Sequence, residues 1–264
     1  MRTPIRLAAA LFRAKLTQAS GREKKYLPIH CVRVPNNHGE DILPASEHIT
    51  FLAGPAFPKR RGQHRRAPVL WLTGEADPLA HPSVGRVTRE LQDSRRTVFL
   101  ETGGSQLRRR IHEFHPDDRL YLTIRLYGTA AIHDLRVAQP GAFALAMEGA
   151  RAAQLSGHLI CLHIVIDAET KFEDIKLLLQ HIRGMEADGV VVTAASTVSP
   201  GPPTMRQFVL AARSLVGNSW WASLSADVEL ALGASHKQTL FVPVLHANPL
   251  ADDATMSGDQ AVAQ

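Results

Sequence analysis

Cysteine is scarce in this sequence: its 264 residues include only Cys31 and Cys161. Two cysteines exclude the multi-bridge disulfide framework that is typical of small secreted domains. Such scarcity is typical of proteins from a reducing compartment, and we therefore expect a cytoplasmic protein.

Long apolar runs are absent as well. No run approaches the roughly 20 residues that a transmembrane helix needs, so no transmembrane segment is predicted. The N-terminal stretch RTPIRLAAALFRAKL is basic, and Arg13 and Lys15 interrupt its apolar part. Because it has neither a longer apolar core nor a small-residue cleavage site, it does not predict a signal peptide.

Aromatic residues make up only 6% of the chain, and none lies within its two arginine-rich runs. These runs are KRRGQHRR at residues 59–66 and RRR at residues 108–110, in a chain of formal net charge +5. Nucleic acids and anionic membranes attract such runs. Since no aromatic side chains interleave with the arginines and no nucleic-acid-binding motif is present, we favour a solvated surface over a nucleic-acid partner.

What the sequence does contain is a regular alternation of short β-like runs and helical stretches. Six strands are predicted, at residues 29–34, 68–73, 96–102, 119–128, 158–167 and 188–196. Helices are predicted after the second to sixth strands, at residues 83–94, 105–114, 141–157, 170–185 and 203–217. The alternation predicts right-handed βαβ units around one parallel α/β sheet. Only residues 35–67, with a short helical candidate and the basic loop, connect two strands less regularly.

The domain organisation follows from the same pattern. Residues 1–26 are expected to form a basic helix, at about residues 4–18, and a linker, and residues 27–248 one α/β domain. A short C-terminal helical segment around Ser219–Leu224 is expected to cover the bottom or side of the sheet. Residues 249–264 are small and polar, which predicts disorder.

Strand periodicity places several polar side chains on one face of the sheet. In residues 119–128 the leucine and isoleucine positions alternate with Tyr121, Thr123, Arg125 and Tyr127. Parallel sheets hold ligands beyond the carboxyl ends of their strands. The residues expected together at that end are Thr73, Glu75, Glu101, Arg125, Tyr127 and His163.

Three local motifs, in this order, resemble those of the radical S-adenosylmethionine (SAM) superfamily. LTGEADPLAHPSVGRVTREL is similar to its second-strand motif TGGEPLLHP, VFLETGGSQL to its third-strand TNG turn, and residues 120–157 to its fourth unit. The opening LFRAKLTQASGREKKYLPI and the later TAASTVSPGPP are similar to the hopanoid-biosynthesis-associated branch. The resemblance implies a partial (β/α)6 barrel over most of the chain and a remnant SAM pocket. That pocket would contain Thr73, Gly74, Glu75, Thr102, Gly103 and Arg125.

The sequence departs from this family most clearly at the iron–sulfur site. Radical SAM enzymes bind a [4Fe–4S] cluster through a CxxxCxxC motif after the first strand, and such a cluster needs thiolate ligands. Here Cys31 lies within the first strand and Cys161 in the fifth, so three cysteine ligands are unattainable. We therefore expect no [4Fe–4S] cluster and no standard radical chemistry.

The SAM-binding motifs are altered too. The family's GGEP is replaced by GEADP at residues 74–78, which removes a glycine and shifts the acid. The serine and aspartate of the family's SLDG motif are replaced by the bulkier Arg125 and Tyr127. Since Arg125 and Glu101 share a face on neighbouring strands, we expect an ion pair that fills part of the space a cofactor would use.

Other polar residues favour structural roles. Cys161 and His163 share one face of a strand, but a zinc site needs three or four ligands, so no metal site is predicted. Asp167, at a strand end, is expected to cap the following helix rather than to act as a catalytic carboxylate. No catalytic residue is therefore assigned.

Three functional hypotheses remain open. The first is a radical SAM-like protein that has lost its cluster ligands and acts as a non-catalytic partner or regulator, for example of an active paralogue. The second is an enzyme of altered chemistry that binds SAM or a related nucleotide without a cluster. The third is an anion- or nucleic-acid-binding protein that uses the arginine-rich loop, with steep salt dependence. The missing cysteines favour the first, and the retained sequence Thr73-Gly74-Glu75 keeps the second open.

Overall fold

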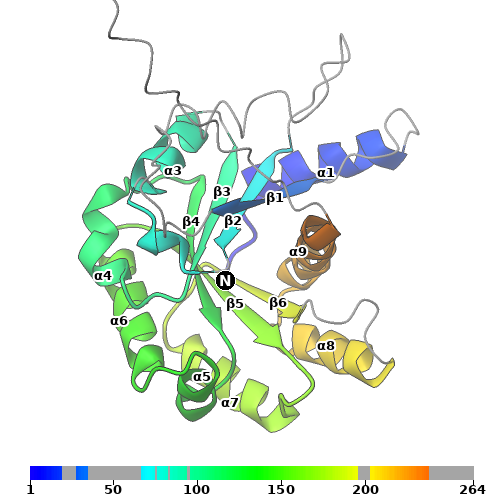
Figure 1. Cartoon of the computed structure of the whole chain (residues 1–264). Helices are drawn as coiled ribbons and strands as arrows, with labels where there is room; N and C mark the ends of the chain where they lie inside the picture. The colour runs from blue at the N-terminus through cyan, green and yellow to red at the C-terminus, as the bar shows by residue number, and fades with distance from the viewer. Residues whose placement is uncertain are drawn as a thin grey trace, which may run out of the picture.

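A curled parallel sheet with helices on its outer face forms the body of the molecule (Figure 1). The structure is a computed structural model, and it describes residues 1–19, 28–34, 67–74, 76–82, 84–93, 96–195 and 203–237. The sheet contains six strands in the order of the chain: β1 (Ile29–Val34), β2 (Val69–Gly74), β3 (Thr97–Thr102), β4 (Leu120–Leu126), β5 (Leu159–Ile166) and β6 (Gly189–Ala194). All neighbouring pairs are parallel, so the predicted alternation and parallel α/β sheet are confirmed, in the form of a half-barrel.

Both faces of the sheet are buried, which is why its strands are rich in branched aliphatic residues. On the outer face, Leu100, Leu122 and Leu162 are fully buried beneath the helices. The inner face carries the alternate residues, among them Phe99, Glu101 and Arg125. This division agrees with the periodicity of residues 119–128.

The helices on the outer face are α3 (Val84–Asp93), α4 (Leu107–Arg110), α5 (Ala130–Arg136), α6 (Ala142–Leu155), α7 (Phe172–Arg183) and α8 (Pro203–Leu215). The predicted continuous helix over residues 105–114 is wrong in its second half, where the chain tightens into the 3₁₀ turn η2 (Ile111–Glu113). Helix α5 has no counterpart among the predicted helices.

Helix α4 packs closely against α6 because glycine and alanine lie between them. A Cβ atom on Gly149 would lie 2.7 Å from the carbonyl oxygen of Gly104. Gly104 itself has φ +83°, a conformation that favours glycine, and a Cβ there would lie 2.9 Å from Cα of Ala146. The second glycine of the TGG turn is therefore explained by packing.

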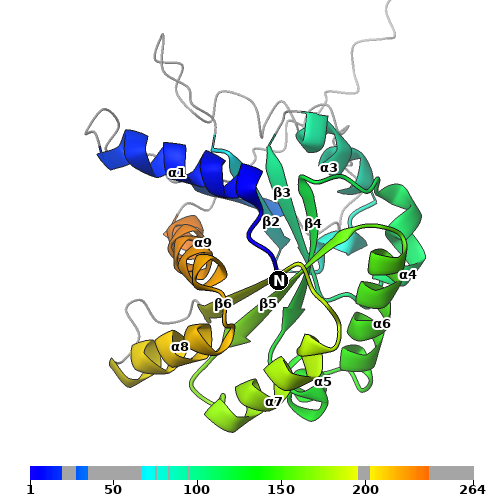
Figure 2. The same ribbon diagram turned by 180° about the vertical axis from the view of Figure 1, so that it is seen from behind.

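The open side of the half-barrel is covered by α9 (Ser219–Lys237) and by α1 (Ile5–Ala19). Helix α9 packs against both edge strands, β6 and β1 (Figure 2). The expectation of a short C-terminal helical segment is wrong in length, since α9 has 19 residues, but its covering role is confirmed. The reason for the length is the gap itself, because a short segment would leave part of the inner face in water.

Trp221 of α9 fills the barrel interior near the start of β6. Its side chain is fully buried, and a Cβ atom on Gly189 of β6 would lie 2.2 Å from its ring. Glycine is therefore required at the start of β6. The indole Nε1 of Trp221 donates a hydrogen bond to the carbonyl oxygen of Arg2 (3.4 Å), which ties the N-terminal segment to this end of the barrel.

Some sequence-based expectations lie outside the described residues. They are the helical candidate and basic loop within residues 35–66, the loop at residues 196–202, and the tail at residues 249–264. Among the helices of the described part, none has the length and apolar character needed to cross a membrane.

Candidate functional site

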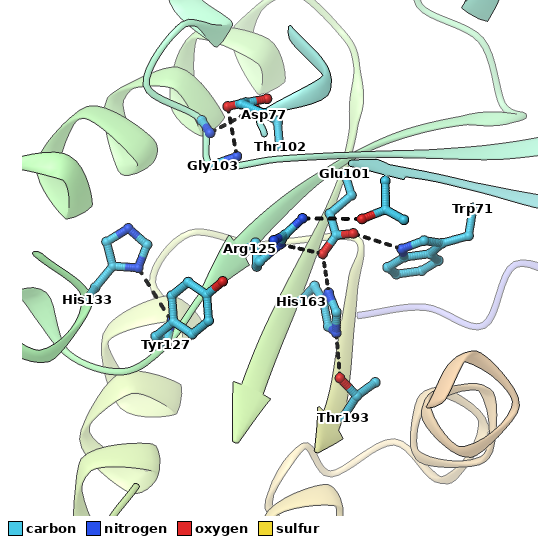
Figure 3. A network of polar contacts seen from close by, with 12 residues as sticks. Trp71, Asp77, Glu101, Thr102, Gly103, Arg125, Tyr127, His133, His163 and Thr193 are labelled. Carbon is cyan, nitrogen blue, oxygen red and sulfur yellow. Dashed lines mark hydrogen bonds and ion pairs between the residues drawn. The ribbon is translucent and has the colours of Figure 1, made fainter. Parts of the chain in front are cut away.

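The candidate site is a buried polar network centred on Glu101 of β3 (Figure 3). The side chain of Glu101 is only 2% exposed, yet it is surrounded by donors. Its Oε1 accepts hydrogen bonds from Arg125 Nε (2.7 Å) and His163 Nδ1 (2.7 Å). Its Oε2 accepts one from the indole Nε1 of Trp71 (3.1 Å). Both carboxylate oxygens are therefore engaged by the protein's own side chains.

Strand register explains how these residues meet. On neighbouring strands Glu101 lies opposite Thr123, while Arg125, two residues further along β4, lies opposite His163 of β5. All of them point to the inside of the curled sheet, and the long arginine side chain reaches back to the carboxylate. The expected ion pair between Arg125 and Glu101 is confirmed.

Arg125 extends the network toward the carboxyl ends of the strands. Its Nη2 donates to the hydroxyl of Thr73 (3.3 Å), and its guanidinium also interacts with the hydroxyl of Tyr127. The side chain of Arg125 is 23% exposed, so this cation lies between the buried carboxylate and the barrel opening. Thr73, Glu101, Arg125 and Tyr127 were expected together, and the structure brings them together.

His163 continues the network to β6. Because an ionised carboxylate only accepts hydrogen bonds, the Nδ1–H group of His163 donates to Glu101. The Nε2 atom of the same ring contacts the hydroxyl of Thr193 (2.8 Å). Thr193 is 1% exposed and escaped the sequence analysis; only its place on the inner face of the sixth predicted strand could have indicated it.

The electrostatics of the network favour an ionised Glu101. Burial alone would raise the pKa of this carboxyl, but the neighbouring His163 and Arg125 outweigh burial and hold the pKa well below its usual range. Burial opposes the charge of Arg125 as well, but Glu101 raises the pKa of the guanidinium above its usual value. The pair is thus charged, internally neutralised and largely removed from water.

A second polar cluster lies beside the first and is built around Asp77. Asp77 Oδ2 accepts hydrogen bonds from the hydroxyl of Thr102 (2.8 Å) and the amide of Gly103 (3.1 Å). Its Oδ1 accepts from the amide of Leu79 (3.0 Å), so Asp77 also caps the 3₁₀ turn η1 (Pro78–Ala80). The sequence analysis noted the displaced acid but missed this role, although an aspartate directly before a proline is a known helix-start signal.

The residues of the expected SAM pocket are therefore divided between two clusters. Thr73 and Arg125 belong to the Glu101 network, whereas Thr102 and Gly103 bind Asp77. Gly74 has a structural requirement of its own, because a Cβ there would lie 2.6 Å from the carbonyl oxygen of Ala76. Glu75 lies outside the described residues.

The two cysteines are free and buried. Burial raises the pKa of the Cys31 thiol to about 12, and it raises the pKa of the Cys161 thiol as well. Among the described residues, no group of three or more histidine, cysteine or acidic side chains is arranged to hold a metal ion. Both thiols are therefore poor ligands and poor nucleophiles.

Asp167 has a different role from the one expected. Its Oδ1 accepts from the amide of Glu169 (3.0 Å) and the hydroxyl of Thr170 (2.8 Å), and Oδ2 pairs with Arg136. The N-cap of α7 is Lys171, so the prediction of a helix cap is wrong. Asp167 stabilises the turn before the helix because its short side chain reaches the amide two residues ahead and the hydroxyl three residues ahead.

Two arginines of residues 108–110 make contacts with other residues of the fold. Arg110 bonds to Glu113 and to the carbonyl oxygen of His81 (3.0 Å), and Arg108 pairs with Glu148. Two of the three cations are thus used within the fold. Residues 59–66, the other arginine-rich run, lie outside the described part.

No protein-family model and no curated protein matches the chain. The chemistry of the side chains can still be compared with the cofactors that the radical SAM resemblance implies. Two buried cysteines do not fit a [4Fe–4S] cluster, which needs three thiolates from the chain. Of the expected SAM residues, Thr102 and Gly103 donate hydrogen bonds to Asp77, and Arg125 donates one to Glu101.

Proposed function

We propose that this protein is a radical SAM-like half-barrel that has lost both cofactors and acts as a non-catalytic partner or regulator of another protein, for example an active paralogue. One observation carries the proposal. The carboxylate of Glu101 is saturated by Arg125, His163 and Trp71 inside the barrel, where a barrel enzyme would hold its ligand.

The closed state of this network argues against a cofactor in its place. A ligand that enters the network must separate Arg125 from Glu101, and the carboxylate, 2% exposed, would then be left with a charge that water cannot reach. The cost of breaking such a buried pair is about 3–5 kcal/mol, which would lower the affinity of any entering ligand by the same free energy.

The Asp77 cluster supports the same conclusion independently. In the radical SAM superfamily, which the sequence resembles, the backbone of the second-strand motif receives the amino group of SAM, and the resemblance places Thr102 and Gly103 in the same pocket. Here the amide of Gly103 donates to Asp77 at 3.1 Å, and the hydroxyl of Thr102 does so at 2.8 Å. A charged acceptor holds amide donors more firmly than a neutral one, so these donors are not offered to a ligand.

The direct test is a calorimetric titration of the purified protein with SAM. It is done under anaerobic conditions, before and after an attempted reconstitution with iron and sulfide. We expect no heat of binding in either condition. Micromolar binding without iron would contradict the proposal and support an enzyme of altered chemistry that uses SAM without a cluster.

The regulatory part of the proposal needs its own measurement. An active radical SAM enzyme that shares the sequence features of residues 68–157 is assayed with and without this protein. We expect its turnover or its stability to change on addition of the wild-type protein. If neither changes for any such enzyme of the same organism, the partner role is wrong even though SAM binding is absent.

A further inference from the structure

Helix α1 has an apolar line on its outward side. Ile5, Phe12 and Leu16 are 81%, 63% and 53% exposed, the highest exposures of large apolar residues on this helix. With Ala9 they follow the spacing i, i+4, i+7, i+11, which at about 3.6 residues per turn places them on one side of the helix. We call these four residues the α1 ridge.

The opposite side of α1 faces the body of the molecule. It carries Leu7 and Leu11, which belong to the hydrophobic core, and the buried Ala14. These residues already anchor the helix, so large apolar side chains on its outer side have no partner within the described part of the chain. An exposed line of isoleucine, phenylalanine and leucine therefore indicates an interaction surface.

Positive charge borders the α1 ridge on both sides. At the same helical spacing, Arg6 and Arg13 fall on one flank and Lys15 on the other. Residues 1–19 contain four basic residues and no acidic one. Arg6 pairs with Asp118 and Lys15 with Asp227. The Arg6 side chain remains 89% exposed, so its pair with Asp118 contributes little free energy and leaves the guanidinium in reach of another anion.

We infer that the α1 ridge docks onto an anionic lipid surface, with the ridge in the interfacial layer and the flanking cations on the lipid phosphates. An apolar helix face bordered by arginine and lysine is the chemistry of helices that lie in the plane of a membrane. The basic character of residues 1–19 complements the negative charge of such a surface. This inference is independent of the proposed regulatory function, because it rests on α1 and not on the barrel interior.

The charges also argue against a second copy of the chain as the occupant. Residues 1–19 carry four basic residues and no acidic one, so two α1 ridges packed face to face would bring like charges together, a repulsion that Asp118 and Asp227 lessen. A lipid surface supplies anions on both flanks of the ridge at once. Figure 2 shows α1 at the edge of the molecule.

The test is cosedimentation of the full chain with vesicles. Vesicles of phosphatidylcholine alone are compared with vesicles that also contain phosphatidylglycerol, over a series of salt concentrations. We expect binding to the anionic vesicles that weakens as salt rises, and little binding to the neutral ones. Absence of binding to the anionic vesicles would overturn the inference.

A matched pair of variants isolates the ridge. Leu16→Glu on α1 and Leu177→Glu on α7 make the same change at side chains of 53% and 55% exposure. We expect Leu16→Glu to lower the vesicle partition coefficient about tenfold, since a large apolar side chain no longer enters the interface, and Leu177→Glu to leave it unchanged. Equal losses in the two variants would contradict the inference.

Sedimentation velocity tests the alternative that a second copy of the chain, rather than a lipid surface, covers the α1 ridge. If the wild-type chain forms a dimer without binding vesicles, and Phe12→Glu converts it to a monomer, the ridge is a contact between copies and the lipid inference is wrong. A wild-type chain that binds anionic vesicles and remains monomeric in their absence supports it. The thermal midpoint of each variant is measured beside these assays, and we expect it to be unchanged because the substituted side chains are exposed.

Discussion

The two ends of the barrel interior are filled by side chains of different chemistry, aromatic at one end and charged at the other. Near the amino ends of the strands, Trp71, Phe99 and Tyr121 stack in sequence, with ring centroids 5.2 and 4.6 Å apart, and Trp221 closes the layer from α9. Toward the carboxyl ends, the space is filled by charged Glu101 and Arg125. Trp71 belongs to both, because its ring stacks on Phe99 and its indole N–H donates to Glu101.

The difference teaches which end of the barrel interior stabilises the fold and which end contributes little to its stability. An aromatic stack gains free energy from apolar burial and needs no partner groups. A buried ion pair contributes little net stability compared with an apolar pair of the same size. Removal of one partner nevertheless destabilises the protein strongly, because it leaves a buried charge without a counter-charge. A gain in stability therefore does not explain the charged residues at the carboxyl ends of these strands.

The largest expected effect is at the aromatic end. Trp221→Ala removes a fully buried ring and leaves a cavity beside Gly189, so we expect a loss of about 4 kcal/mol in the free energy of unfolding. Urea denaturation measures it, with Trp220→Ala as the neighbouring control at a half-buried position. If both variants lose equally little, α9 does not fill the barrel as described.

At the polar end, Arg125→Met is expected to cost about 3 kcal/mol. The value lies at the low end for a buried pair because His163 and Trp71 still donate to Glu101. The double variant Glu101→Gln with Arg125→Met should be more stable than Arg125→Met alone, since the stranded charge is gone and the amide still accepts from His163. A neutral Arg125→Met in urea denaturation would show that the charge of Glu101 does not depend on this partner.

A smaller effect is expected at the Asp77 cluster. Asp77→Ala removes the acceptor of Thr102, Gly103 and Leu79, and we expect a loss of about 2 kcal/mol in urea denaturation. Asp77→Asn should lose less, because the amide oxygen still accepts. Titration with SAM should remain without heat in Asp77→Ala; if binding appears, Asp77 alone is what excludes the ligand.

The smallest expected effect is the change in the free energy of unfolding with pH that the ion pair causes. The folded state lowers the pKa of Glu101, so its stabilising contribution is complete above the unfolded value of about 4.3 and is lost as the pH falls from there toward the folded value. One such group contributes a slope of at most about 1.4 kcal/mol per pH unit. Urea denaturation at a series of pH values should show this slope in the wild-type protein and not in Glu101→Gln. A Glu101→Gln variant with the wild-type slope would assign the acid sensitivity to other carboxyls.

Much of the fold could be predicted because the strands are buried on both faces. Six runs rich in branched residues, the last five each followed by a helical period, left few alternatives to a parallel α/β sheet. The extent of α9 could not be predicted, since the gap between β1 and β6 exists only once the sheet has curled. The break after α4 was missed for a related reason: Arg110 makes its contacts with Leu79 and His81, about thirty residues away.

The candidate site, like the fold, could be predicted only in part. Alternation along β3 and β4 was enough to predict that Glu101 and Arg125 share the inner face, and the ion pair followed from their charges. The saturation of Glu101 by Trp71 and the connection of His163 to Thr193 join four different strands, which local periodicity cannot place at one height. The capture of Thr102 and Gly103 by Asp77 was equally out of reach, because it depends on where the loop after β2 returns.

By itself, then, the sequence determined the alternation of strands and helices, the shortage of cysteine ligands and the facing of the polar side chains. These properties depend on composition and on periods of a few residues, which the chain carries before it folds. Only the tertiary structure decided that Asp77 binds Thr102 and Gly103, that Glu101 binds Arg125, His163 and Trp71, and that the apolar ridge of α1 faces outward. Hydrogen bonds and burial are set by distances in space between segments far apart in the chain, and those distances exist only after the barrel has closed around Trp221.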